Sequence, residues 1–343
     1  MAILITGGGG FVMSNLARLW LEHHSQDDVV ILDSGPLDAA LERFIAPHTD
    51  RFHYVRASVL DKDALNRIGR DHDITHVIHG ATITLFAPVD SDGTSVANSE
   101  TDMPADVLEV NIMGTVNVLD WARKLPNLAR FINVSSGAVY NDYGPEPFGP
   151  MPEEGWVDPP EFYGISKLST EMVARRYSQL FGMSIASCRL SGVYGPMDRH
   201  RPSRAHYCAP YVVVHQALEG QPIRIKAPNA VGDHIHAGDV ARAIMALLAK
   251  AGPLNHPVYN IALGQSVTLE ELVAEIGRIV PGTRWELCGT GACDIVSDDT
   301  FKGGRWGAYD ISRISDETGW RPRPLSVALA DYVSFVRAFG VTR

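Results

Sequence analysis

A tyrosine and a lysine four residues apart are the first pair in this sequence that could carry chemistry. Tyr163 and Lys167 lie in "EFYGISKLSTEMVARRYSQLF", which we interpret as a helix, so both side chains project from one helix face. A phenol with a pKa near 10 transfers protons poorly at neutral pH. The lysine ammonium and a second nearby cation would stabilise the phenolate, and lowering the phenol pKa by ~3 units takes about 4 kcal/mol. The spacing predicts that Tyr163 is an acid–base catalyst and Lys167 its activator.

A serine precedes this pair at the end of a predicted strand. Ser136 lies in "NVSSGAVY", and an α/β sheet presents its reactive side chains at the carboxyl ends of its strands. A hydroxyl at that edge can donate a hydrogen bond to the substrate oxygen that Tyr163 deprotonates. The three residues together predict proton transfer at a substrate hydroxyl.

The elements that must position these residues are strands alternating with helices. The predicted strands read "AILIT", "VVILD", "FHYVRASV", "THVIHGA", "RFINVSS" and "PVYNIAL". Short, continuously apolar strands separated by helices are typical of a parallel sheet that helices cover on both faces. The sequence therefore predicts an α/β fold with a doubly wound parallel sheet of the Rossmann type.

The chain opens with "MAILITGGGGFVMSN", a predicted strand, glycine-rich turn and helix. Backbone N–H groups at such a helix start bind a pyrophosphate; Gly7 permits the tight turn and Gly10 the close approach. Met13 replaces a third glycine whose usual role is helix–strand packing, and methionine adapts well to irregular spaces. Asp33 ends the next strand, where a carboxylate binds a ribose 2′-hydroxyl and repels a 2′-phosphate. These features predict a dinucleotide site that favours NAD over NADP. The alternative interpretation is that the glycine run is only a flexible turn and that Asp33 is only a helix cap.

The domain prediction follows from where this pattern breaks. We expect an NAD-binding domain over residues 1–190, with a returning segment at about 233–264, and a smaller, mainly substrate-binding part over 191–343. In that part, Thr268 and Glu271 form the capping box of a predicted helix, and the tail from Trp285 onward is less regular. The stretch "YNDYGPEPFGPMPEEGWVDPPEF" is interpreted as an active-site loop.

Taken together, these motifs resemble the extended short-chain dehydrogenases/reductases, the family of NAD-dependent epimerases and dehydratases. The resemblance runs from "ITGGGGFV" through "THVIHGAT", "NIMGTVNVLDWA", "NVSSGAVY", "YGISK" and "RLSGVYGP" to "DISRISDETGWRPRPLSVALADYV". It implies that Ser136, Tyr163 and Lys167 are catalytic. Cofactor contacts are expected from Gly7, Gly10, Phe11, Val12, Asp33, Ser58, Val59, Gly80, Ala81, Thr82, Asn111, Val134, Tyr163 and Lys167. Ser58 replaces the customary aspartate of the family at an adenine contact.

Two departures from the family pattern bear on the substrate. Nucleotide-sugar members usually have an asparagine at the position of Gly192 and an arginine at that of Gly232, and both substitutions weaken the case for a diphosphate. The basic stretch "GPMDRHRPSRAHY" supplies guanidinium groups, which suit carboxylates and phosphates; the alternative is a solvated basic loop. We expect a small-molecule substrate that is anionic and lacks a nucleotide. Its expected contacts are Thr82, Ser136, Gly137, Arg199, Arg204 and His236.

The leading functional hypothesis is an NAD-dependent oxidoreductase of the epimerase/dehydratase type. It would take hydride from a secondary alcohol of a sugar-like or hydroxy-acid substrate, and either release the ketone or return the hydride to the other face. One alternative is a nucleotide-sugar 4-epimerase, and another is a non-catalytic NAD-binding regulator or scaffold. Dehydratases of this fold typically carry an Asp–Glu pair directly after the serine, where this chain has Gly137 and Ala138, so dehydration is disfavoured.

Composition and charge narrow the partners. A formal net charge of −10 argues against nucleic acid, and the sequence has no apolar run long enough for a membrane span and no secretory leader pattern. Four cysteines without Cys-x-x-Cys spacing predict free thiols in a reducing cytoplasm. His234 and His236 lack a third ligand at usable spacing, which predicts packing and no metal. By the resemblance, helices at 103–124 and 161–181 would pair across a homodimer axis.

Overall fold

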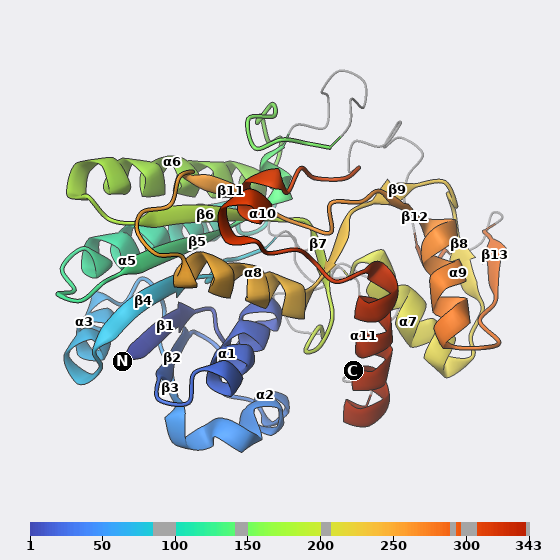
Figure 1. Cartoon of the computed structure of the whole chain (residues 1–343), viewed down its shortest axis with the longest axis horizontal. Coiled ribbons are helices and arrows are strands. Elements are labelled where there is room, and N and C mark those ends of the chain that lie inside the picture. The colour runs from blue at the N-terminus through green and yellow to red at the C-terminus, as the bar shows by residue number, and fades with distance from the viewer. Residues whose placement is uncertain (85–100, 141–149, 200–206, 289–292, 296–306, 341–343) are drawn as a thin grey trace.

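The computed structural model describes residues 1–84, 101–140, 150–199, 207–288, 293–295 and 307–340. Within these residues the largest sheet has seven parallel strands, in the order β11-β6-β5-β4-β1-β2-β3 (Figure 1). Their bounds are β1 Ala2–Thr6, β2 Asp28–Asp33, β3 Phe52–Arg56, β4 Ile74–His79, β5 Arg130–Ser136, β6 Ile185–Leu190 and β11 Val258–Ile261. The strand order reverses direction between β1 and β4, and in doubly wound sheets ligands bind outside the carboxyl ends at such a switch point. The predicted fold class is confirmed.

Both faces of the sheet are covered because its strands are apolar on both sides. Along β1, Ile3 and Ile5 pack with α1 and α8, whereas Ala2 and Leu4 pack with α3 and α5 on the other face. The bounds of these helices are α1 Phe11–His23, α3 Lys62–Asp71, α5 Gly114–Ala122 and α8 Ala237–Ala249. Two shorter helical segments, α2 Ala39–Ile45 and η1 Ala46–Arg51, connect β2 to β3. This alternation is what a fully buried parallel strand requires.

The helix predicted over 103–124 is composite. It begins with α4 Pro104–Leu108, continues through the π-helical segment η2 Glu109–Met113 and ends with α5. The predicted helix at 161–181 is α6 Phe162–Phe181, which ends where Gly182 adopts a left-handed conformation with φ 66°. A short helical turn, η3 Gly137–Val139, follows β5 directly.

The segment over residues 233–264 contributes one strand to the sheet and one helix to its cover. β10 His234–His236 leads into α8, which packs against α1, and β11 then pairs in parallel with β6. β10 also pairs with β7 Gly192–Tyr194, which places the segment after β6 beside the returning chain.

The C-terminal part packs its own apolar cluster beside the sheet (Figure 1). Its elements are α7 Ala209–Glu219, β8 Ile223–Ile225, β9 Val231–Gly232, β12 Val267–Thr268, α9 Leu269–Ile279, β13 Trp285–Leu287 and α11 Leu325–Phe339. By contrast, α10 Ser312–Thr318 packs against β11 and α8 and buries Ile314 in the core of the large sheet. The capping box of α9 forms as predicted, with the Thr268 hydroxyl and the Glu271 carboxylate each capping the other's backbone. The tail is more regular than expected, because α11 buries Leu329, Tyr332 and Val336 in this cluster.

One cysteine prediction is wrong. Cys288 and Cys293 form a disulfide, with their Cα atoms 5.6 Å apart. Both ends of this short loop lie along β8, since the Cys288 N–H bonds to Ile225 and the Asp294 N–H to Arg224, and that pairing brings the two sulfurs together. Cys188 and Cys208 remain thiols, as predicted. None of the helices that the structure describes combines the length and apolar character needed to cross a bilayer.

Candidate active site

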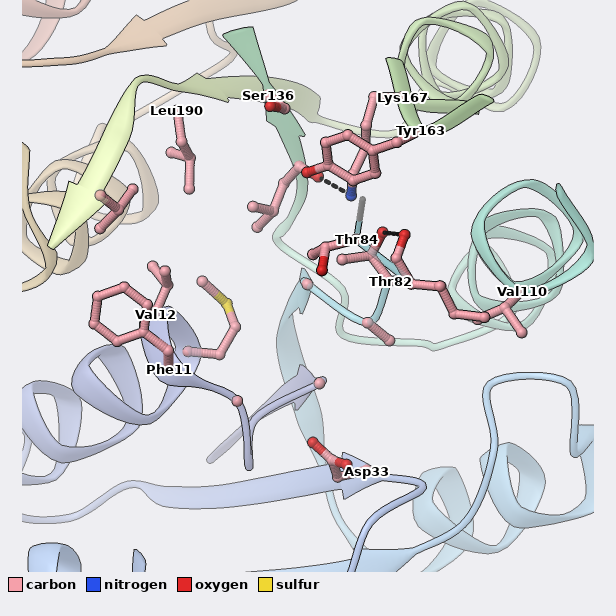
Figure 2. Close-up of a pocket in the computed structure, with 18 of the residues that line it drawn as sticks. Phe11, Val12, Asp33, Thr82, Thr84, Val110, Ser136, Tyr163, Lys167 and Leu190 are labelled. Atoms are coloured by element: carbon pink, nitrogen blue, oxygen red, sulfur yellow. Dashed lines mark hydrogen bonds between the residues drawn. The ribbon is translucent and has the colours of Figure 1, made fainter. Parts of the chain in front are cut away.

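A cavity of about 740 Å³ opens at the carboxyl ends of the strands (Figure 2). It gathers residues that end β2, β5 and β6, residues that follow β1 and β4, and residues of α6, because parallel strands all end at the same edge of the sheet. The predicted residues that line it are Gly7, Gly10, Phe11, Val12, Asp33, Ser58, Val59, Gly80, Ala81, Thr82, Val134, Ser136, Tyr163, Lys167 and Arg199. The cavity therefore joins the predicted nucleotide turn to the predicted proton-transfer residues.

The tyrosine and lysine lie one turn apart on α6 and both face this cavity (Figure 2). The Lys167 Nζ lies 5.8 Å from the centre of the Tyr163 ring and donates a 2.9 Å hydrogen bond to the Val134 carbonyl of β5. That bond fixes the ammonium between helix and sheet. A cation held at this distance favours the phenolate over the phenol.

Burial also affects the lysine itself. Its side chain is buried, and desolvation lowers the pKa of the Lys167 ammonium to about 8, opposed by the Glu171 carboxylate one turn further along α6. Glu171 is held by a bidentate pair with Arg189, at 2.7 and 2.9 Å, and accepts a hydrogen bond from Ser135. Lys167 still carries its proton for the most part at neutral pH, which the activator role predicted from the sequence requires.

Ser136 ends β5 at the rim of the same cavity. Its hydroxyl oxygen accepts a 3.1 Å hydrogen bond from the Ala138 N–H, so the turn η3 holds the side chain in place. The hydroxyl proton is the part that could be donated to a substrate oxygen.

The nucleotide end is built around Asp33. Its two carboxylate oxygens accept hydrogen bonds from the N–H groups of Gly9, at 3.0 Å, and Gly35, at 2.9 Å. Gly7 has φ 67°, and a Cβ there would come within 2.8 Å of the Ala81 backbone, so only glycine fits this turn. Each carboxylate oxygen retains acceptor capacity for a ribose hydroxyl, and the residues fit a dinucleotide.

The structure explains how the turn functions without its third glycine. Met13 is buried, and a Cβ added to Gly80 at the end of β4 would lie 2.6 Å from its Cγ and 2.7 Å from its Sδ. The methionine therefore occupies the space that the missing side chain of Gly80 leaves. The close packing of α1 against β4 is therefore preserved, with the glycine after the strand, at position 80, instead of on the helix, at position 13.

A buried polar column supports the floor of the cavity. The imidazole of His79 bonds to the Thr6 hydroxyl at 2.8 Å and to the Thr115 hydroxyl at 2.9 Å, and the Thr6 oxygen accepts from the Ala81 N–H. Burial lowers the pKa of His79 to about 3, with a further contribution from Lys167. Sequence reasoning missed this function for His79, although the residue lies in the quoted motif "THVIHGAT".

Several predicted contacts lie elsewhere. Asn111 does not line the cavity: its side chain is buried and bonds to both backbone groups of Ile83, at 2.7 and 3.0 Å, so it supports the lining from behind. Gly137 does not line the cavity, and a side chain there would meet the Tyr309 hydroxyl. His236 is buried against Tyr194 and accepts from Gly238, away from the cavity. Arg204 lies outside the described residues.

The basic stretch contributes differently from expectation. Arg199 lines the cavity, but its guanidinium makes a bidentate pair with Asp38, at 2.7 and 2.9 Å. Arg201 lies outside the described residues. Lining residues that sequence reasoning did not select include Thr84, Leu190, Val193, Met197, Tyr207 and Cys208. The motif "RLSGVYGP" could have indicated Leu190 and Val193, which lie within it, and Met197, which follows it.

The two substrate-side glycines lie on either side of one imidazole. A Cβ at Gly192 would come within 2.7 Å of the His234 Nδ1, and a Cβ at Gly232 within 2.6 Å of its Nε2. Burial lowers the pKa of His234 to about 4, so the ring is neutral at physiological pH. The space of two polar side chains is thus filled by one uncharged ring.

The fold and the cavity together define an α/β protein of the dinucleotide-binding type, with Tyr163 and Lys167 one helical turn apart in the cavity lining. The model of the NAD-dependent epimerase/dehydratase family matches residues 3–262, and the chain belongs to this family. It is therefore an NAD-dependent enzyme of the epimerase/dehydratase type, and the hypothesis of a non-catalytic regulator or scaffold is not supported.

Individual relatives are distant but match almost end to end. The chain is 29% identical to a "Putative UDP-glucose 4-epimerase" of Methanocaldococcus jannaschii over 93% of both chains. It is 28% identical to a dTDP-glucose 4,6-dehydratase of Salmonella typhimurium, over 94% of this chain and 88% of the relative. Among solved structures, the UDP-glucuronic acid 4-epimerase of Bacillus cereus, in complex with UDP-glucuronic acid and NAD, superposes with a TM-score of 0.76. It is 24% identical and the match covers 99% of this chain and all of that one, which supports the fold.

Proposed function

We propose that this enzyme oxidises a secondary alcohol of a sugar-like or hydroxy-acid substrate, with Tyr163 taking the hydroxyl proton. The observation that carries the proposal is the convergence of Ser136, Tyr163 and Lys167 on the cavity that Gly7 and Asp33 also line. NAD, when bound, supplies the hydride acceptor. Ser136 orients the substrate oxygen, and Lys167 holds the Tyr163 phenolate stable until the proton has moved.

The fate of the oxidised product separates two reactions. If the ketone is released, the enzyme is a dehydrogenase. If the ketone rotates within the site and regains hydride on its other face, the enzyme is an epimerase. A dehydration step would require an acid–base pair after Ser136. Gly137 and Ala138 offer none, and the Tyr309 hydroxyl lies where a side chain at position 137 would begin.

For the substrate, we favour an anionic compound without a nucleotide. Support comes from His234, whose neutral ring fills the space between Gly192 and Gly232, where nucleotide-sugar members usually carry two polar side chains. Because Arg199 is paired with Asp38, an anionic group would have to compete for that guanidinium or use another cation of the same stretch. The second candidate is a nucleotide-sugar 4-epimerase, which the M. jannaschii relative favours.

The test is a substrate panel of sugar acids, free sugars and nucleotide sugars. NADH absorbance reports net oxidation, and the stereochemistry of recovered substrate reports epimerisation. In Tyr163→Phe, turnover should fall by about 10²–10⁴-fold while NAD still binds. Tyr177→Phe is the matched control, because Tyr177 lies on the same helix but outside the cavity lining.

Each outcome of the panel has a clear meaning. Wild-type turnover in Tyr163→Phe would place the chemistry elsewhere. Saturable turnover of a UDP-sugar, with no activity on sugar acids, would support the 4-epimerase and overturn the preference for a substrate without a nucleotide.

We also propose a homodimer through the composite helix α4–η2–α5 and through α6, the helices predicted at 103–124 and 161–181. Exposed apolar side chains gather here: Met113 is 49% exposed, and Ile165, Met172 and Leu180 recur along α6 with exposures of 39%, 67% and 55%. Their spacing of seven and eight residues puts these α6 side chains on one stripe of the helix. A contiguous exposed apolar stripe is typical of a protein–protein interface.

A further inference from the structure

A second cluster of ligand-type side chains lies at the opposite edge of the sheet from the cavity. Asp28 is the first residue of β2, His53 lies near the start of β3, and His72 directly follows α3. Among the described residues this is the only group of three His, Cys, Asp or Glu side chains whose ligand atoms all lie within 4.8 Å of one another.

Strand alternation puts the side chains of Asp28 and His53 on one face of the sheet. Asp28 shares its face of β2 with Val30, and His53 shares its face of β3 with Val55. Val30 and Val55 pack with the apolar side chains of α3. His53 pairs with Val30 across the ladder, so the end of α3 brings His72 over the same corner of the sheet.

The distances suit a tetrahedral ion. The His53 Nε2 lies 3.4 Å from the Asp28 Oδ2, and two ligands at zinc distances with a tetrahedral angle lie about 3.3–3.4 Å apart. The centre of the His72 ring is 4.9 Å from that of His53, so a small side-chain adjustment would complete a three-ligand set.

One atom of the cluster points to a missing partner. The His53 Nε2 atom is buried, although the side chain is 38% exposed; the atom forms no hydrogen bond within the described residues, and the Asp28 carboxylate 3.4 Å away is at ion-pair distance only. A buried polar nitrogen without a bond is costly, and a cation bound between it and the Asp28 carboxylate would satisfy both. All three residues are partly exposed, which leaves an entry path for an ion.

We propose that Asp28, His53 and His72 bind a zinc ion, with water as the fourth ligand. Two imidazoles and a carboxylate are a ligand set that zinc accepts in three-residue sites. The ion would join β2, β3 and α3 at the edge of the sheet and stabilise the folded state, because the unfolded chain does not preform the site. Asp33 lies five residues further along β2, about 16 Å away at the rise of a strand, so the site is separate from the cavity.

The test uses the untagged full-length chain, saturated with NAD and freed of metals. Titration with zinc in a calorimeter should give one ion per chain, and cobalt(II) should give the visible absorption of a tetrahedral complex. His53→Gln, His72→Gln and Asp28→Asn should each weaken zinc binding at least about tenfold. His23→Gln, which removes an exposed imidazole from α1, should leave zinc affinity unchanged.

NAD affinity serves as the check that each variant is folded, since the cavity lies at the other edge. The unfolding temperature of the wild type should rise with zinc, and that rise should vanish in His53→Gln. The proposal is overturned if the wild type binds no zinc, or if His53→Gln and His72→Gln, with normal NAD affinity, bind zinc as tightly as the wild type.

Discussion

The contact between Met13 and Gly80 makes a sharp prediction about stability. Changing Gly80 to alanine adds a methyl group 2.6 Å from the Met13 Cγ and 3.2 Å from the Thr6 carbonyl oxygen. Ordinary carbon contacts are about 3.5–4.0 Å, so the methionine must retreat by about 1 Å in a packed interior. Overpacking of this kind costs about 1–3 kcal/mol, and we expect Gly80→Ala to lower the free energy of unfolding by that amount.

The cause can be isolated with a double-mutant cycle. Met13→Ala alone should cost about 2–5 kcal/mol, because it leaves a cavity beneath the glycine turn. In the Met13→Ala background, however, Gly80→Ala no longer brings a methyl group against the methionine side chain. The cost of the second change should therefore shrink by at least about 1 kcal/mol, within the usual range of coupling between contacting residues.

Urea unfolding of the four proteins without NAD measures this coupling. Gly277→Ala is the matched control, since a Cβ there meets only Thr283 at 3.9 Å and a glycine-to-alanine change inside a helix should stabilise by about 0.5–1 kcal/mol. If Gly80→Ala costs the same with Met13 present or absent, the methionine does not fill the space of a missing glycine, and our explanation of the turn is wrong.

Three further predictions follow from the site and its surroundings. NAD should bind at least about tenfold more tightly than NADP, or about 1.4 kcal/mol, because Asp33 repels a 2′-phosphate; equal affinities by calorimetry would contradict this. Folding stability should fall as pH drops from about 6.5 towards 4, because the pKa of the buried His79 is lowered to about 3 in the folded protein and the imidazole is protonated in the unfolded chain first. The loss should be ~1.4 kcal/mol per pH unit for each such imidazole. A free energy of unfolding in urea that does not change over this pH range would contradict the prediction. Met172→Glu should yield monomers in light scattering if α6 forms the dimer interface, and an unchanged particle mass would exclude that face.

The local signals in the sequence were sufficient for the fold class and for the grouping of Ser136, Tyr163 and Lys167 at one cavity. Period-2 and helical patterns identify strands and helices, and parallel strands necessarily present their carboxyl ends at one edge. Gly7 follows such a strand, Asp33 and Ser136 end one, and Tyr163 lies in the first turn of such a helix. Their convergence on one cavity could therefore be predicted without coordinates. The capping box of α9 is equally local, because both partners lie within one turn.

Tertiary structure decided what depends on contacts between distant segments. Whether Met13 breaks the nucleotide turn depends on a glycine 67 positions later in the chain, and no local pattern states that the two meet. Likewise, Asn111 turned out to support Ile83 rather than line the cavity, and Arg199 to pair with Asp38. The disulfide of Cys288 and Cys293 also needed the neighbouring strand β8 to bring its ends together.

The same distinction explains the substrate side of the site. From the sequence, Gly192 and Gly232 could be described only as two missing polar groups. The fold places the uncharged ring of His234 between them, so that this ring occupies the space that polar side chains at positions 192 and 232 would need. The sequence determines which residue types are available and on which element they lie. Which side chains contact one another is decided by packing between segments such as those of Gly192 and Gly232, which are 40 residues apart in the chain. The reason is that steric exclusion acts on distance in three dimensions and not along the chain.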